Sequence, residues 1–192
     1  MTDEVKVEVR RSGRTFEAEA VLDLGADAQT IWETITDYDA LARYMPGIHH
    51  CHVSERNPRG NGDEHLVVEQ RGEFRFMMFA QTMKVLLNIE NRHLQSSVAK
   101  AVRFDLGSIF TRRAIDVFEG TYVLSKLPVE GSSPRTHLVY TAIIGLRLPP
   151  PPSIGNIAIR QNLVVQLEAV AKEVARRAGR PGAQPQIVKT TV

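Results

Sequence analysis

The N-terminal part of the chain alternates apolar and polar residues with a period of two. The alternation runs through residues 5–10 and again through residues 16–22, and Ser12-Gly13-Arg14 between them has the composition of a turn. A period of two is typical of a strand that buries one face. We therefore predict a β-hairpin at the start of the fold.

Helical spacing replaces this alternation after Leu24. Asp27 is a suitable N-cap, and the apolar residues at positions 28, 31, 32 and 35 share one face of a helix. A second helical turn is predicted for residues 40–44. It must end before Pro46, because the residue that precedes a proline disfavours helical geometry. Two short helices are thus expected to follow the hairpin.

The middle of the chain is a succession of strand patterns separated by turn residues. We predict strands at 47–57, 63–76, 78–90, 93–105, 113–126 and 135–147. Short links between consecutive strands favour an antiparallel meander. In the strands at 93–105 and 135–147 both parities carry apolar residues, so the sequence does not decide which side faces inward.

The C-terminal part begins with four prolines, at positions 149–152, which force an extended backbone. A single long helix is predicted from Ser153 to Ala178, with Gly179 ending it. Its predicted core-facing stripe consists of Ile157, Val164, Leu167, Ala171 and Val174. We expect one domain over residues 4–179 and a flexible tail over residues 180–192.

Composition and charge exclude several classes of protein. The apolar fraction of 43% and the charged fraction of 24% are near the averages for globular domains. The formal net charge is only +2, so we expect no nucleic-acid partner. No stretch reaches the roughly 20 apolar residues that cross a bilayer, and the first residues lack the order of a signal peptide. We therefore expect a cytoplasmic protein that makes at most transient contact with a membrane.

Three groups of residues carry a resemblance to a known superfamily. They are Trp32 to Tyr38 with Met45-Pro46-Gly47, then Phe118 to Tyr122, and then Leu148 to Pro152 followed by Gly155, Arg160 and Leu163. From about Phe16 to Ala178 the chain resembles the START-like (SRPBCC) superfamily, and within it the polyketide cyclase/dehydrase and coenzyme Q-binding branch.

The resemblance implies an α+β fold of the helix-grip type. In this fold a curved antiparallel sheet wraps around a long C-terminal helix, with two short helices after the first long strand, and here an extra N-terminal strand. It also implies a cavity that takes a lipid, a quinone or a polyketide-like molecule. It does not imply a reaction, because the superfamily contains both enzymes and carriers.

Alternation within the strands predicts which residues face such a cavity. Between Leu66 and Phe76 the charged residues share one parity, so the other parity, which includes Gln70, must point inward. The same argument directs Gln81 inward on the next strand. Two inward amides can orient a ligand carbonyl or hydroxyl, or they can pair with each other or with buried water. The predicted ligand-binding residues are Gln70, Phe74, Phe76, Gln81, Met83, Val85, Tyr122, Ile157 and Val164.

Three residues are candidates for catalysis. Asp116 falls on the inward parity of its strand, where burial would raise its carboxyl pKa and suit it to act as a general base. The alternative is a solvated carboxylate at a strand end. Lys100 and Tyr140 can polarise a ketone, but the sequence does not decide the direction of either side chain.

The cluster His49-His50-Cys51-His52 first suggests a metal, because His50 and His52 project to one face of a strand. Cys51 is the only cysteine, so no second cysteine completes a zinc spacing. We interpret the cluster as a polar strand face and expect neither a metal nor a cofactor. Nothing beside Cys51 in the sequence predicts a lowered thiol pKa.

Three functions remain open at this point. The first, which we favour, is the binding or transport of a small hydrophobic ligand. The second is an enzyme of the cyclase/dehydratase type that acts on an aromatic polyketide-like substrate in the same cavity. The third is a protein-interaction module with a filled cavity. A carboxylate or histidine within hydrogen-bond reach of a tyrosine or arginine deep in the cavity would favour the enzyme.

Overall fold

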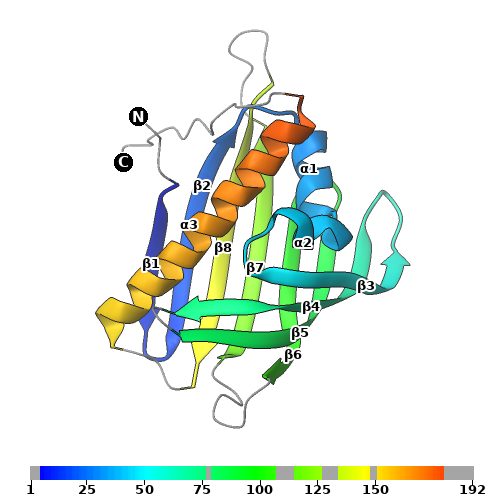
Figure 1. The fold of residues 1–192 in the computed structure, drawn as a ribbon. Helices are drawn as coiled ribbons and strands as arrows, with labels where there is room; N and C mark the ends of the chain where they lie inside the picture. Colours follow the sequence, from blue (N-terminus) through cyan, green and yellow to red (C-terminus); the bar gives the residue numbers. More distant parts are fainter. Residues whose placement is uncertain (1–4, 77–78, 107–114, 127–133, 148–150, 180–192) are drawn as a thin grey trace.

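A single eight-stranded sheet and one long helix dominate the molecule (Figure 1). The computed structural model describes residues 5–76, 79–106, 115–126, 134–147 and 151–179, and the predicted tail at 180–192 lies outside them. All neighbouring strands are antiparallel, in the order β1-β2-β8-β7-β6-β5-β4-β3. The predicted meander is therefore confirmed, and β2 joins its last strand to the N-terminal hairpin.

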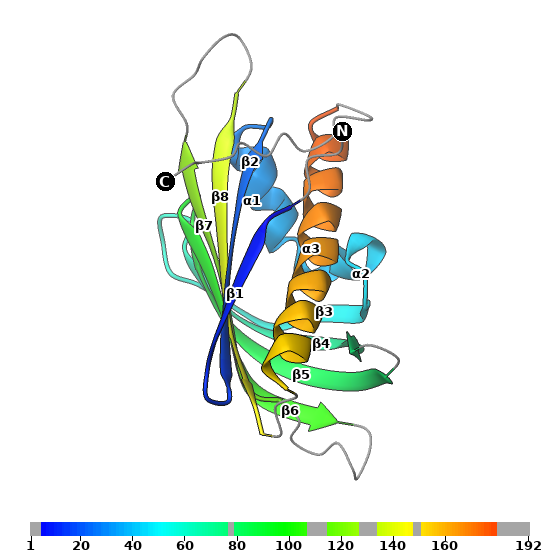
Figure 2. The same cartoon turned by 90° about the vertical axis from the view of Figure 1, so that its left-hand side faces the viewer.

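The strands are β1 (Val7–Ser12), β2 (Thr15–Leu24), β3 (Ile48–Pro58), β4 (Glu64–Phe76), β5 (Phe79–Arg92), β6 (Ser96–Leu106), β7 (Ile115–Lys126) and β8 (Thr136–Leu146). The helices are α1 (Ala28–Thr36), the 3₁₀ turn η1 (Tyr38–Ala40), α2 (Leu41–Tyr44) and α3 (Pro152–Arg177). Figure 2 shows the curvature of the sheet, with all the helices on its concave side. None of the described helices is both long and apolar enough to span a membrane.

The start of α1 follows from one side chain. The Asp27 carboxylate accepts hydrogen bonds from the Thr30 backbone N–H at 2.8 Å and from the Thr30 hydroxyl at 2.9 Å. These bonds satisfy one of the free N–H groups at the helix N-terminus and lower the pKa of Asp27. The predicted N-cap is confirmed.

Helix α3 crosses the concave face and contacts β1, β2, α1 and α2. It begins at Pro152 and not at a Ser153 cap, since proline at the first helical position sacrifices no hydrogen bond. In its second half Leu167, Ala171 and Val174 are buried, as predicted, and Val170 is buried with them.

The first half of α3 differs from the prediction. Ile157 is 52% exposed, and Ala158 and Ile159 next to it are buried instead. In this half of α3 the helix carries apolar residues on several of its faces. The sequence pattern therefore does not determine which face packs against the sheet. The prediction that Ile157 faces the sheet is wrong.

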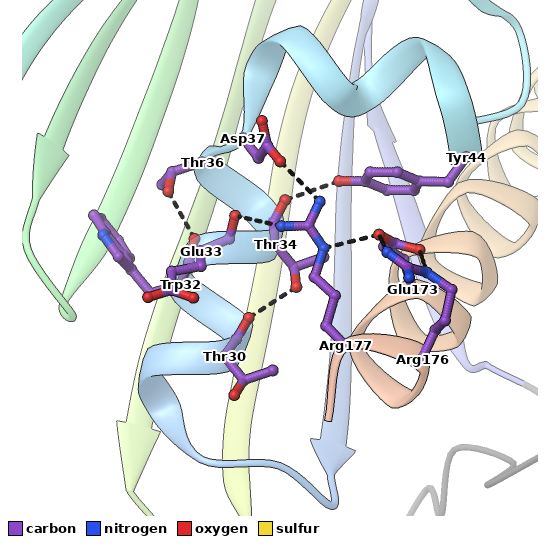
Figure 3. A network of polar contacts seen from close by, with 10 residues as sticks. All are labelled: Thr30, Trp32, Glu33, Thr34, Thr36, Asp37, Tyr44, Glu173, Arg176 and Arg177. Carbon is purple, nitrogen blue, oxygen red and sulfur yellow. Dashed lines mark hydrogen bonds and ion pairs between the residues drawn. The ribbon is translucent and has the colours of Figure 1, made fainter. Parts of the chain in front are cut away.

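A polar network fastens the C-terminal end of α3 to α1 (Figure 3). The Glu173 carboxylate accepts hydrogen bonds from Arg176 at 2.7 Å and from Arg177 at 2.8 Å. Arg177 also forms an ion pair with Asp37 at 2.8 Å, immediately after α1. Tyr44 donates its hydroxyl to the Thr34 carbonyl at 2.8 Å, which ties α2 to the same helix.

The Glu173 ion pairs make stability depend on pH. The hydrogen bonds from Arg176 lower the pKa of Glu173 from 4.5 to about 2. Because the folded-state pKa lies below the unfolded-state value, these contacts stabilise the fold above pH 4.5 and lose their effect as the pH falls toward 2. We expect Glu173→Gln to lower the unfolding free energy by about 1–2 kcal/mol at pH 7, a modest value because Arg176 remains largely in water.

Urea denaturation at a series of pH values checks this expectation. The difference between wild type and Glu173→Gln should shrink as the pH falls from 4.5 toward 2. Glu168→Gln is the control, since Glu168 lies on the same helix and makes no ion pair within the described residues. A difference that stays constant with pH would contradict the assignment.

Candidate ligand-binding cavity

A cavity of about 200 Å³ lies between the concave face of the sheet, α3 and the short helices. Its walls are mainly apolar and include Ile35, Leu41, Met45, Val68, Val85, Leu87, Ile144, Leu163 and Val170. An apolar cavity of about 150 Å³ is large enough to bind benzene. The space here therefore accommodates a somewhat larger molecule, of about two fused rings.

Four of the predicted ligand-binding residues line this cavity: Gln70, Met83, Val85 and Tyr122. The side chains of Phe74, Phe76 and Gln81 lie outside the described residues. From α3, the cavity is lined by Ile159, Asn162, Leu163, Gln166 and Val170. Val164 is half-buried and packs against the core, and the exposed Ile157 points away from the cavity, so the helix presents a different face from the one predicted.

The candidates for catalysis separate in the structure. Tyr140 is buried and lines the cavity. Asp116 is exposed, because a bulge between Ile115 and Val117 breaks the alternation and turns Ile115 inward in its place. Lys100 is also exposed and pairs with Glu119 at 3.0 Å on the outer face of the sheet. The inward orientation predicted for Asp116 is wrong.

Five residues on adjacent strands form what we call the polar row. Glu64 on β4 pairs in register with Asn91 on β5, Asn91 with Ser97 on β6, Ser97 with Tyr122 on β7, and Tyr122 with Tyr140 on β8. Ser97, Tyr122 and Tyr140 line the cavity. Polar groups therefore cross the mainly apolar concave face in one continuous line.

The two tyrosines of the polar row lie against each other, with ring centroids 4.7 Å apart. Burial raises the pKa of Tyr140 to about 12 and that of Tyr122 well above its usual value, so both phenols are neutral near pH 7. Within the described part of the chain, neither hydroxyl has a hydrogen-bond partner. Both can therefore donate to a ligand.

Gly120 makes room for one of these hydroxyls. A Cβ atom at this position would lie 3.2 Å from the Tyr140 hydroxyl oxygen and 3.3 Å from the Phe118 ring. The absence of a side chain at Gly120 thus lets the Tyr140 hydroxyl lie close to the backbone of β7. The Phe118 to Tyr122 segment, which carried part of the family resemblance, contributes directly to the cavity wall.

Tyr38 joins the other end of the polar row from η1. Its hydroxyl donates to Asn91 Oδ1 at 3.0 Å and lies 3.1 Å from Ser97 Oγ. Burial raises the pKa of Tyr38 to about 12. Asn91 in turn donates from Nδ2 to Glu64 at 3.0 Å, and Glu64 pairs with Arg56.

The described wall of the cavity contains almost no charged residues. Among the described residues that line it, Glu73 is the only one of a charged type, and it belongs to the parity of β4 opposite to that of Gln70; there is no lysine, arginine or histidine. The remaining polar groups are hydroxyls, amides and the Cys51 thiol. Burial raises the pKa of Cys51 to about 12, so the thiol is protonated and poorly nucleophilic at neutral pH.

The histidines beside Cys51 point away from the cavity. His49, His50 and His52 are all exposed, and His52 Nδ1 lies 3.2 Å from an Asp39 carboxylate oxygen. Across the described ranges, no group of three or more His, Cys, Asp or Glu side chains is arranged to hold a metal ion.

Sequence reasoning missed Tyr38, Asn91 and Ser97. Asn91 and Ser97 flank the β5–β6 turn, so their polarity reads as turn composition and not as part of a site. Tyr38 stands out in the sequence only as part of a family motif. Strand register brings Asn91 beside Ser97, and the position of η1 against the sheet adds Tyr38. A single sequence reveals neither.

The molecule is similar in structure to several known proteins. A START superfamily protein from Mycobacterium smegmatis superposes with a TM-score of 0.60 at 16% identity, over 85% of this chain and 97% of the other. The Zhui aromatase/cyclase from Streptomyces sp. R1128 gives 0.62 at 18% identity, over 85% and 95%. The di-domain aromatase/cyclase BexL of the BE-7585A biosynthetic pathway gives 0.61 at 12% identity, over 90% of this chain and 52% of BexL.

These likenesses define the class of fold. The chain has the START-like helix-grip fold that its sequence motifs implied. No family model matches the sequence, and no curated protein matches it either.

Proposed function

We propose that the protein binds a neutral, hydrophobic small molecule in the cavity between α3 and the sheet. The observation that carries this proposal is an open apolar space of about 200 Å³ crossed by a row of polar groups. Apolar walls drive binding through the surface that leaves water, and a few polar groups set the orientation of the ligand. The open space also argues against a protein-interaction module with a filled cavity.

The charge of the wall supports a neutral ligand. A carboxylate or phosphate buried here would meet no lysine, arginine or histidine among the described lining residues. Burying an uncompensated charge is far more costly than burying a neutral polar group. Ketones, quinones, phenols and polyketide-like molecules meet this condition, whereas ionised fatty acids do not.

The second candidate is an enzyme of the cyclase/dehydratase type, which the aromatase/cyclases among the structural neighbours favour. Such a reaction needs an acid and a base beside the substrate. Tyr122 and Tyr140 can polarise a ketone as neutral donors, but their raised pKa values make them poor bases at neutral pH. Asp116 and Lys100 lie outside the cavity. We therefore propose binding as the primary function.

Two naphthalenes of nearly equal shape test the proposal. We expect 2-acetylnaphthalene to bind one-to-one and 2-naphthoate to bind at least about tenfold more weakly at pH 7, because only the ketone is neutral. Isothermal titration calorimetry measures both affinities. Failure of the ketone to bind would overturn the proposal, and tighter binding of the carboxylate would overturn the requirement for a neutral ligand.

A further inference from the structure

The hydrogen bonds at one end of the polar row run in a single direction. The Glu64 carboxylate pairs with Arg56, and an ionised carboxylate only accepts hydrogen bonds. Asn91 therefore presents its NH₂ group to Glu64, at 3.0 Å. The other end of the same amide, Oδ1, must then face Tyr38.

This orientation fixes the hydroxyl of Tyr38 as well. Asn91 Oδ1 has no proton, so the phenol donates its only proton to it, at 3.0 Å. The Tyr38 oxygen lies 3.1 Å from Ser97 Oγ. Because the phenol has no second proton, the Ser97 hydroxyl must be the donor of this bond.

Ser97 is thereby left with acceptor capacity alone. It is 4% exposed, it lines the cavity, and its one proton is committed to Tyr38. We propose that Ser97 Oγ is an acceptor subsite that recognises an O–H or N–H donor on the ligand. This inference rests on the proposed function and narrows it: the cavity takes a neutral aromatic or polycyclic molecule that carries a hydroxyl or an N–H group.

The neighbouring residue of the row gives the ligand a second constraint. Tyr122 is the register partner of Ser97, and its hydroxyl has no hydrogen-bond partner among the described residues. A phenol can donate where Ser97 can only accept. A ligand with a hydroxyl beside a carbonyl matches both groups at once.

A pair of probes separates this inference from simple apolar binding. In 2-naphthol the ring carries an O–H donor, whereas in 2-methoxynaphthalene a methyl group replaces that proton. Affinities for both are measured by calorimetry with wild type, Ser97→Ala, Tyr38→Phe and Ser96→Ala. Ser96 is the matched control, because it neighbours Ser97 on β6 and is not among the cavity-lining residues.

The expected readout is the ratio of the two affinities in each variant relative to wild type. Ser97→Ala should lower the preference for naphthol about tenfold, the effect of one lost hydrogen bond, and Ser96→Ala should leave it unchanged. In Tyr38→Phe the Ser97 hydroxyl loses its acceptor on Tyr38 and can instead donate a hydrogen bond to a ligand in the cavity. The affinity for the ether should then rise relative to that for naphthol.

An unchanged ratio in Ser97→Ala would overturn the subsite while leaving the proposed function in place. If neither probe binds the wild-type protein, the subsite and the proposed function are both overturned. Ser97→Ala removes a single oxygen atom, so it decides the question even where Tyr38→Phe fails to fold. Thermal unfolding of each variant, followed by circular dichroism, distinguishes a folding defect from a binding defect.

Discussion

Replacement of Val85 by tryptophan is expected to abolish the binding of 2-acetylnaphthalene while the domain stays folded. Val85 is buried on β5 and its side chain lines the cavity. The larger indole would enter the open space and occupy the volume that the ligand needs. We expect an affinity loss of at least about 100-fold, and a loss of unfolding free energy below about 1 kcal/mol, since a packed core would lose about 1–3 kcal/mol or more on overpacking.

Two other valines serve as controls for this substitution. Val174 is 2% exposed on α3 and is not among the cavity-lining residues, so Val174→Trp should destabilise the fold by about 2–3 kcal/mol. Val165 is 49% exposed, and Val165→Trp should change neither stability nor binding. If Val85→Trp and Val174→Trp destabilise the fold equally, no open cavity exists beside Val85.

Gly72→Ala is expected to destabilise the fold strongly, although it adds only one methyl group. A Cβ atom at Gly72 would lie 2.3 Å from the backbone oxygen of Gly47, well inside van der Waals contact. Gly47 itself has a φ of +81°, and its oxygen accepts a hydrogen bond from the Glu73 N–H at 2.7 Å. Backbone on both sides leaves little freedom to relax, so we expect a loss of about 3 kcal/mol in urea denaturation.

Gly120→Ala provides the comparison for Gly72→Ala. At Gly120 the nearest atoms belong to the side chains of Tyr140 and Phe118, at 3.2 and 3.3 Å, and these can rotate away. The cost should stay near about 1 kcal/mol or below, with a change in ligand affinity as the main effect. If both alanine variants unfold at the same urea concentration, the close approach of the Gly47 backbone does not make a Cβ atom at position 72 especially costly.

Much of the fold was accessible from the sequence because strand alternation and turn residues are local signals. The parity argument directed Gln70, Met83, Val85 and Tyr122 toward the side of the sheet that carries the cavity. Charged residues on the opposite parity made this direction unambiguous for β4, since they must face water. The N-cap at Asp27 is equally local, and the sequence predicts it for the same reason.

The wrong predictions for Asp116 and Ile157, and the failure to foresee the polar row, have non-local causes. The bulge beside Asp116 is a feature of the pairing of β7 with β8, and the alternation within β7 alone does not show it. The orientation of α3 is set by the surfaces of β1, β2 and α1, so the apolar pattern of the helix alone placed Ile157 on the wrong side. The polar row likewise depends on five strands in register, and only the three-dimensional pairing brings Asn91 and Ser97 beside Tyr122.

The pairing of β2 with β8 has a consequence for how the molecule assembles. It joins Thr15 to Gly145, residues 130 positions apart, whereas the strands from β3 to β8 each pair with their neighbours in the sequence. Closing so long a loop costs chain entropy before any contact compensates it, and such contacts slow folding. During synthesis the meander can form before α3 has emerged, so the apolar concave face must wait for the last helix before it is covered. We therefore expect a stage during synthesis in which the apolar wall of the cavity is exposed to water and open to aggregation.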